Sequence, residues 1–135
     1  MSFTMPRVVY LSGIYNAGLA VTLCCPPAYQ ALGLHFPAPF WGYLVAAFVA
    51  YTSAALILAA RNLRQRASFV YWEALLRFAT AALIVPQGLF GDVGRIAVPL
   101  GLADLGVGLV YLIGIPRALG VAPYALLWDQ LPQDE

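Results

Sequence analysis

Four apolar stretches constrain the fold of this chain more than any other feature. They cover residues 8–25, 40–60, 69–90 and 96–115. Each is close to the roughly 20 residues that a helix needs to cross a bilayer, and a helix satisfies its own backbone hydrogen bonds in lipid. Only 10% of the residues are charged, whereas a soluble domain carries roughly 25%. The sequence therefore predicts a single all-α integral membrane domain, an up-and-down bundle of four transmembrane helices.

The arginines predict the orientation of this bundle. With four crossings, five arginines fall on one side of the membrane: Arg7, Arg61, Arg64, Arg66 and Arg117. The other side carries only Arg95. Because arginine and lysine accumulate in cytoplasmic loops, we expect both termini in the cytoplasm. All seven basic residues are arginine, beside abundant Ala, Gly and Pro. This bias is typical of GC-rich bacterial genomes, so we expect a bacterial inner membrane.

Several residues are expected to anchor the chain at the membrane surface. Arg61, Arg64 and Arg66 fill the second connection and can contact anionic lipids. Trp41, Trp72 and Trp128 stand near the ends of the predicted spans, at the level that amphipathic rings favour. The first connection, residues 26–39, is expected to lie against the membrane surface. The C-terminal segment, residues 119–135, is expected to be interfacial, with Leu126, Leu127 and Leu131 toward lipid and Asp129 toward water.

Three charged residues lie inside the predicted spans, where an arginine or aspartate costs about 2.5–3.5 kcal/mol. Glu73 and Arg77 are four residues apart and share one helix face. Arg77 lies roughly 12 Å and Asp104 roughly 16 Å from the cytoplasmic end. The third and fourth helices are neighbours, so we expect an Arg77–Asp104 pair. Asn16 and Thr52 lie at similar depths, and Tyr111 lies on the Asp104 stripe. All four spans thus contribute to one polar layer.

Small residues indicate which face of the fourth span points inward. Gly101 and Gly108 share the stripe of Asp104, and small residues let helix backbones approach closely in membranes. We therefore expect this stripe to pack inside the bundle.

The polar layer has two interpretations. It is a charge network that fixes the register of the bundle or docks it onto a partner, or it is a site that handles protons or binds a headgroup. Two acids and one arginine leave a surplus of negative charge. This surplus favours protonation of one acid, or a cationic or hydrogen-bond-donating ligand.

Several kinds of chemistry find no support. Cys24 and Cys25 are adjacent and lack the spacing of a disulfide, redox or zinc motif. His35 is the only histidine and lies in a connection. We therefore expect no metal site and no catalytic residues. The net charge of +1 gives no basic surface for nucleic acid. No cofactor is indicated, although a lipid or quinone could bind.

The long first connection, which ends in Pro37-Ala38-Pro39, and the overall layout resemble the DoxX-like small bacterial four-helix membrane proteins. Some members of that group resemble subunits of quinone-linked oxidoreductase complexes. We therefore expect a non-catalytic accessory subunit of a larger respiratory or photosynthetic inner-membrane complex, with other membrane subunits as partners. The alternative is a stand-alone protein that binds a lipid or quinone through the buried Glu/Arg/Asp layer.

Overall fold

The computed structural model describes residues 4–131, which fold into helices without any strand. Four long helices and two short ones follow in the order α1 (Met5–Leu23), α2 (Pro26–Ala31), α3 (Pro39–Arg61), α4 (Leu63–Phe90), α5 (Ala97–Leu119) and α6 (Pro123–Leu127). Proline occupies one or both of the first two positions of α1, α2, α3 and α6. The backbone N–H groups there have no acceptor within the helix, so the N–H that proline lacks costs no hydrogen bond. Gly120 ends α5 in the left-handed conformation, with a φ of 65°.

Three helices in the described part of the chain are long and apolar enough to cross a membrane, namely α3, α4 and α5. The chain is therefore a helical membrane protein. Helix α1 has 19 residues, but Pro6, Arg7 and Asn16 dilute its apolar sequence. Its crossing, and with it the fourth span, stays a prediction.

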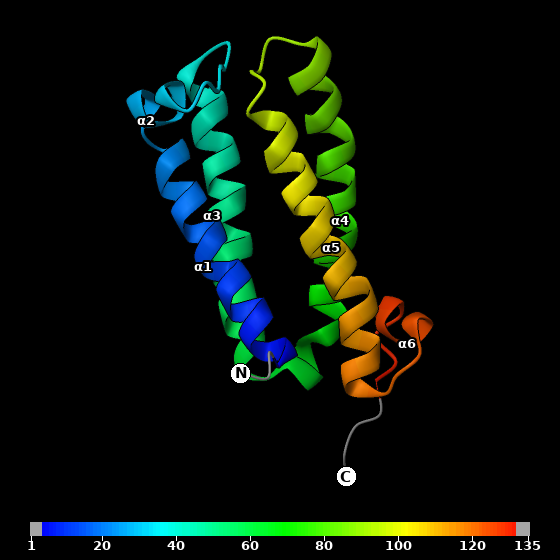
Figure 1. Cartoon of the computed structure of the whole chain (residues 1–135). Helices are drawn as coiled ribbons and strands as arrows, with labels where there is room; N and C mark the ends of the chain where they lie inside the picture. The colour runs from blue at the N-terminus through cyan, green and yellow to red at the C-terminus, as the bar shows by residue number, and fades with distance from the viewer. Residues whose placement is uncertain (1–3, 132–135) are drawn as a thin grey trace.

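The long helices form two antiparallel hairpins, α1 with α3 and α4 with α5, which lie side by side (Figure 1). In the first hairpin, a Cβ on Gly13 would lie 2.8 Å from Ile57 Cγ1 and 3.2 Å from the carbonyl oxygen of Ser53. The Ser53 hydroxyl donates to the Gly13 carbonyl at 2.7 Å. Glycine is thus required here because the two backbones touch. The two hairpins contact each other far less than the helices within each hairpin do.

Gly101 and Gly108 lie in the second hairpin, at the contact between α5 and α4. A Cβ on Gly101 would lie 2.6 Å from Val85 Cγ2. A Cβ on Gly108 would lie 3.0 Å from Phe78 Cε2. Both glycines are buried, so the predicted small-residue stripe packs inside the bundle.

The junction between α3 and α4 differs from the sequence prediction of an arginine-filled connection. Only Asn62 separates the two helices, and Arg64 and Arg66 belong to the first turn of α4. Buried Leu63 and Ala67 begin the packed face of α4, so the helix starts before the apolar stretch does. The Arg66 guanidinium donates to the Leu58 carbonyl near the end of α3 at 2.6 Å, which satisfies one of the open carbonyls of a helix end.

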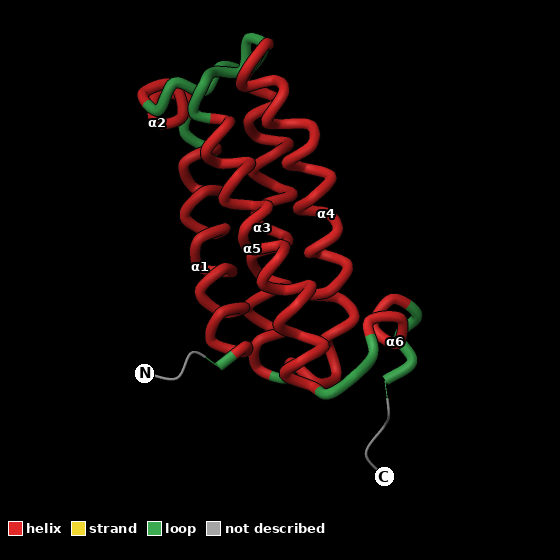
Figure 2. The backbone as a smooth tube through the Cα atoms, turned by 45° about the vertical axis from the view of Figure 1, so that its right-hand side comes forward, coloured by secondary structure: helices red, strands yellow, loops and turns green. Residues whose placement is uncertain are grey.

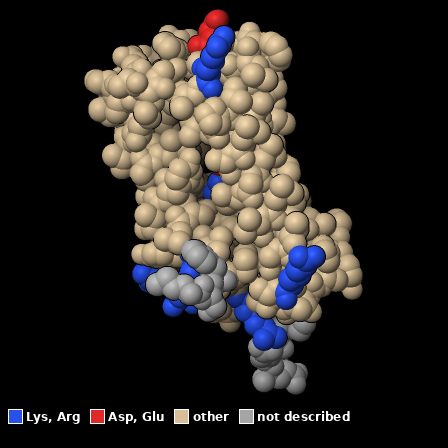
Figure 3. All heavy atoms as spheres, in the orientation of Figure 1, with Lys and Arg blue, Asp and Glu red and all other residues tan. Residues whose placement is uncertain are grey.

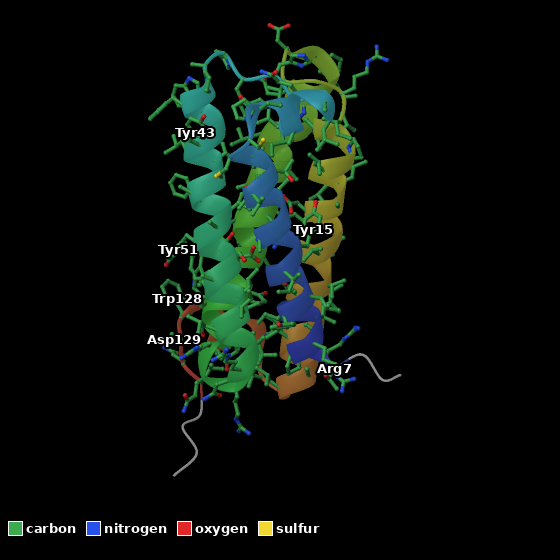
Figure 4. The ribbon with its side chains drawn as sticks, turned by 90° about the vertical axis from the view of Figure 1, so that its left-hand side faces the viewer. Arg7, Tyr15, Tyr43, Tyr51, Trp128 and Asp129 are labelled. Carbon is green, nitrogen blue, oxygen red and sulfur yellow. The ribbon has the colours of Figure 1, made fainter. Side chains whose placement is uncertain are left out.

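Basic side chains gather at one end of the molecule (Figure 3). At this end α1 begins and α6 packs (Figure 2). Arg7, Trp128 and Asp129 lie at this end (Figure 4). The α4–α5 connection, which carries Asp92 and Arg95, lies at the opposite end with α2. The arginine asymmetry read from the sequence is therefore an asymmetry of the folded molecule.

The connection between α1 and α3 packs against the end of the bundle. Its expected position at the membrane surface stays a prediction. Tyr29 and Leu34 are almost fully buried, and the Tyr29 and Phe36 rings meet edge to face at 5.1 Å. The His35 amide donates to the Val93 carbonyl in the α4–α5 connection at 2.9 Å. This contact ties the two hairpins together at the end opposite the arginine cluster.

The prediction that Leu126 faces lipid is wrong. Its side chain is fully buried in the core formed with Val70 and Ile115. The Trp72 indole donates to the Leu127 carbonyl at 3.1 Å, so α6 folds back onto α4. A short helix with one leucine-rich side buries that side against the nearest apolar surface, which here is protein. Residues 132–135 of the predicted interfacial segment lie outside the described residues.

Two apolar cores fill the bundle, one toward each end. One core gathers around Val9, Leu56 and Tyr111 near α6. The other gathers around Leu23, Tyr29 and Leu34 near α2. The charged and amide side chains of the predicted polar layer lie between these cores, at mid-bundle, whereas Tyr111 belongs to the core near α6.

Candidate functional site

Arg77 lies midway along α4 and is the centre of the site. Its side chain is only 4% exposed. The Nε atom lies 2.8 Å from Glu73 Oε1 and 3.0 Å from Oε2, one turn earlier on the same helix. Glu73 is 5% exposed. The spacing of four residues brings these groups together, and burial among apolar helices makes their pairing necessary.

Asp104 on α5 forms the second ion pair, with Arg77 Nη1 2.6 Å from its Oδ1. This side chain remains 24% exposed, in contrast to Glu73. Among the described residues, Asp104 accepts a hydrogen bond only through Oδ1. Its second oxygen is therefore available to a group from outside the protein.

The guanidinium also reaches the first hairpin. Nη2 lies 3.2 Å from the Ser12 hydroxyl and 3.4 Å from Asn16 Oδ1 on α1. The Asn16 amide nitrogen donates to the Thr52 hydroxyl on α3 at 3.1 Å, and Thr52 donates to the Val49 carbonyl. One continuous hydrogen-bonded layer thus connects all four long helices.

The structure brings together every residue of the predicted layer: Asn16, Thr52, Glu73, Arg77, Asp104 and Tyr111. Tyr111 is fully buried and contributes its ring, with Arg77 Cζ 5.8 Å from the ring centroid. Its hydroxyl has no hydrogen-bond partner among the described residues. Ser12 was not predicted. Its position four residues before Asn16, on the same face of α1, is the signal that identifies it.

A pocket of about 220 Å³ opens beside the layer between α3 and α4. We call it the α3–α4 pocket. It combines polar and apolar side chains. Its polar side chains are Asn16, Thr52, Glu73, Arg77, Thr80 and Asp104, and its apolar ones are Leu19, Val45, Phe48, Val49 and Leu76.

A second opening lies on the other side of the bundle, between α1 and α5. This groove has a volume of about 460 Å³ and is lined by Ser12, Tyr15 and apolar residues such as Leu11 and Val107. Figure 3 shows a hollow midway along the face that carries α1 and α5, with a basic group at its bottom. Away from the two ends, the rest of that face is uncharged. The polar layer is therefore close to the surface on both sides of the hairpin interface.

The layer carries charged groups that can bind a ligand. Within residues 4–131, no group of three or more His, Cys, Asp or Glu side chains could hold a metal ion. Cys24 and Cys25 are exposed at the end of α1, away from the layer. One arginine faces two carboxylates, so the layer attracts positive charge and hydrogen-bond donors.

The predicted anchors lie on the surface. Arg61, Arg64 and Arg66 are exposed at the end of the bundle where α3 meets α4. Trp41 is exposed in the first turn of α3. Trp72 and Trp128 are exposed near α6, and Trp72 also holds α6 through its indole.

Comparison of this chain with protein-family models, curated proteins and solved structures gives no match.

Proposed function

We propose that this chain is a non-catalytic protein of the bacterial inner membrane that binds a lipid or quinone in the α3–α4 pocket. One observation carries this proposal. The partly exposed Asp104 carboxylate, with only one oxygen bonded to Arg77, lines a pocket whose other walls are apolar. A polar group and an apolar surface in one pocket suit an amphiphile, whose head reaches Asp104 while its tail lies along residues such as Phe48 and Leu76.

In a purely structural network, every charged side chain would be buried and fully hydrogen-bonded within the protein. The Glu73–Arg77 pair meets the burial condition, with both side chains about 95% buried. Asp104 does not, although a carboxylate that is half satisfied at mid-membrane is costly. A ligand that donates to Asp104 removes this cost, so the open oxygen favours the binding role over the structural one.

The membrane arrangement is part of the proposal. Helix α1 packs along α3 within one hairpin, so a membrane that α3 crosses also surrounds α1. Asn16 of α1 is bonded at mid-bundle, which lowers the cost of its amide in lipid. With four crossings, the excess of arginine at one end supports a cytoplasmic position for that end and for both termini.

Pocket filling tests the proposal. Thr80→Phe adds a ring inside the α3–α4 pocket, whereas Leu83→Phe adds one at a lipid-facing position of the same helix that is 71% exposed. Both variants and the wild type are extracted in a mild detergent and analysed by native mass spectrometry. We expect a bound small amphiphile on the wild type and on Leu83→Phe, but not on Thr80→Phe. Equal occupancy in all three proteins would overturn the proposal.

A second candidate is an accessory subunit of a larger membrane complex, as the resemblance to DoxX-like proteins implies. Tyr51 favours it. This residue lies mid-way along α3, is 67% exposed and points away from the bundle (Figure 4). Tyrosine normally lies at the membrane surface, where its hydroxyl reaches water, so a Tyr51 at mid-span suggests that a helix from another subunit accepts its hydrogen bond.

Native mass measurement also tests this second candidate. If Tyr51 faces a partner, the wild type migrates with additional protein after mild extraction, and Tyr51→Phe weakens that association. Tyr43→Phe serves as the control because Tyr43 lies nearer the end of α3. A wild type that runs only as a monomer would exclude the subunit role.

A further inference from the structure

We infer that the head of the bound amphiphile is a small hydrogen-bond donor, namely an alcohol, a phenol or a primary amine. A phosphate, a carboxylate or a quinone carbonyl is disfavoured. This inference rests on the proposed binding function and narrows the ligand class. Three features of the α3–α4 pocket support it, namely its largely occupied donors, its open acceptor and its depth in the bundle.

Most N–H donors of the layer that line the pocket are already occupied. The Tyr111 hydroxyl has no partner among the described residues, but Tyr111 does not line this pocket. A guanidinium has five N–H bonds, and four of those of Arg77 have a partner. Arg77 directs Nε to Glu73, Nη1 to Asp104, and Nη2 to both Ser12 and Asn16. The Asn16 amide donates to Thr52. A head that only accepts hydrogen bonds would have few open donors to bind, chiefly the second N–H of Arg77 Nη1.

The acceptor side of the layer is open. Asp104 keeps one oxygen without a hydrogen bond from the described residues, and its side chain is 24% exposed. Its charge is balanced only in part, because its partner Arg77 also forms an ion pair with Glu73. A hydroxyl or ammonium group fits this oxygen, whereas an anionic head would meet repulsion from two carboxylates. Thr80 also lines the pocket. Its hydroxyl can donate or accept a hydrogen bond, so it does not favour one kind of head over the other.

The depth of the pocket, rather than its size, disfavours a phosphate head. A volume of about 220 Å³ equals the liquid volume of roughly seven waters, at about 30 Å³ each. That space holds a polar head and a few methylenes, and it does not by itself exclude a phosphate. The layer also lies at mid-bundle, where losing water from a phosphate is costly. Among redox lipids, the same reasoning favours a quinol, which has two phenolic hydroxyls, over the oxidised quinone.

Four probes with one shared tail separate these properties: dodecanol, dodecylamine, dodecyltrimethylammonium and dodecyl phosphate. Their binding to the full-length protein in mild detergent is measured by native mass spectrometry. The alcohol and the amine should bind roughly tenfold or more tightly than the trimethylammonium and phosphate probes, as a lost hydrogen bond to a charged group implies. The amine and trimethylammonium pair is decisive because both are cations and only the amine has N–H donors.

Asp104→Asn should remove the preference for the amine over the trimethylammonium probe. Asp92→Asn is the matched control because it changes an exposed acid in the α4–α5 connection, and it should keep the preference. If the phosphate or trimethylammonium probe binds as tightly as the alcohol, the donor-head inference fails while the binding function stands. If none of the four probes binds, the binding function fails with it. The wild-type series decides the matter even if Asp104→Asn does not fold.

Discussion

Arg77 on α4 and Asp104 on α5 form an ion pair, with Nη1 2.6 Å from Oδ1, at the level between the two apolar cores. The same guanidinium donates to Ser12 and Asn16 on α1. One side chain therefore joins the two helices of one hairpin and connects that hairpin to the other. Since the hairpins contact each other sparsely, this residue has a large share in holding them together.

Arg77→Leu should destabilise the folded protein by about 3–5 kcal/mol, because it leaves the buried Glu73 carboxylate without its partner. The measurement is unfolding in mixed micelles, followed by circular dichroism. Arg95→Leu removes an exposed arginine of the α4–α5 connection and should have little effect. Equal stability of Arg77→Leu and the wild type would show that the layer does not hold the hairpins.

Gly13→Ala should destabilise the protein by about 1–3 kcal/mol, the usual cost of overpacking. Its new Cβ would meet Ile57 Cγ1 at 2.8 Å and the Ser53 carbonyl at 3.2 Å, and the backbone cannot move aside easily. Gly18→Ala, on the same helix, meets no atom within 4 Å and should be neutral or slightly stabilising. Thermal denaturation of the two variants in one detergent checks the contrast. If Gly18→Ala costs as much as Gly13→Ala, the close approach of α1 and α3 is wrong.

Trp72→Phe should release α6 from α4, because it deletes the indole donor to the Leu127 carbonyl at 3.1 Å. The loss of one neutral hydrogen bond is worth about 1 kcal/mol. Limited proteolysis of the reconstituted protein should then cleave the segment that follows Gly120 faster than in the wild type. Trp128→Phe is the control because Trp128 is 72% exposed and makes no such bond. Identical cleavage rates in the two variants would contradict this role for Trp72.

The proposed orientation predicts how the native cysteines react. Cys24 and Cys25 are exposed at the end of α1 opposite the arginine cluster, so a membrane-impermeant maleimide should label them in right-side-out vesicles. A variant with both changed to serine and with Asn62→Cys should react only in inside-out vesicles. The reverse pattern would place the arginine cluster outside the cell. If both sites are labelled from the same side, α3 does not cross the membrane between Cys25 and Asn62, which contradicts the account.

The sequence predicted the four long helices and most members of the polar layer, but it missed the short helix α2 and Ser12. Spacing along one helix places Glu73 beside Arg77, and the short α4–α5 connection makes Asp104 their neighbour. The pocket was not predictable, because it depends on how far the two hairpins separate. Leu126 was misassigned because its leucine-rich pattern does not distinguish a lipid surface from a protein surface. The early start of α4 was missed because Arg64 and Arg66 interrupt its apolar pattern, although Leu63 and Ala67 continue its buried face.

The most direct test of the central claim is to locate the amphiphile by photo-crosslinking. A fatty alcohol with a diazirine in its tail is added to the reconstituted wild type and to Thr80→Phe, and the adducts are mapped by peptide mass spectrometry. The account predicts adducts concentrated at the α3–α4 pocket, in residues 45–52 of α3 and 76–80 of α4, and their loss in Thr80→Phe. Adducts spread evenly over the lipid-facing residues of all four helices, unchanged in Thr80→Phe, would contradict it.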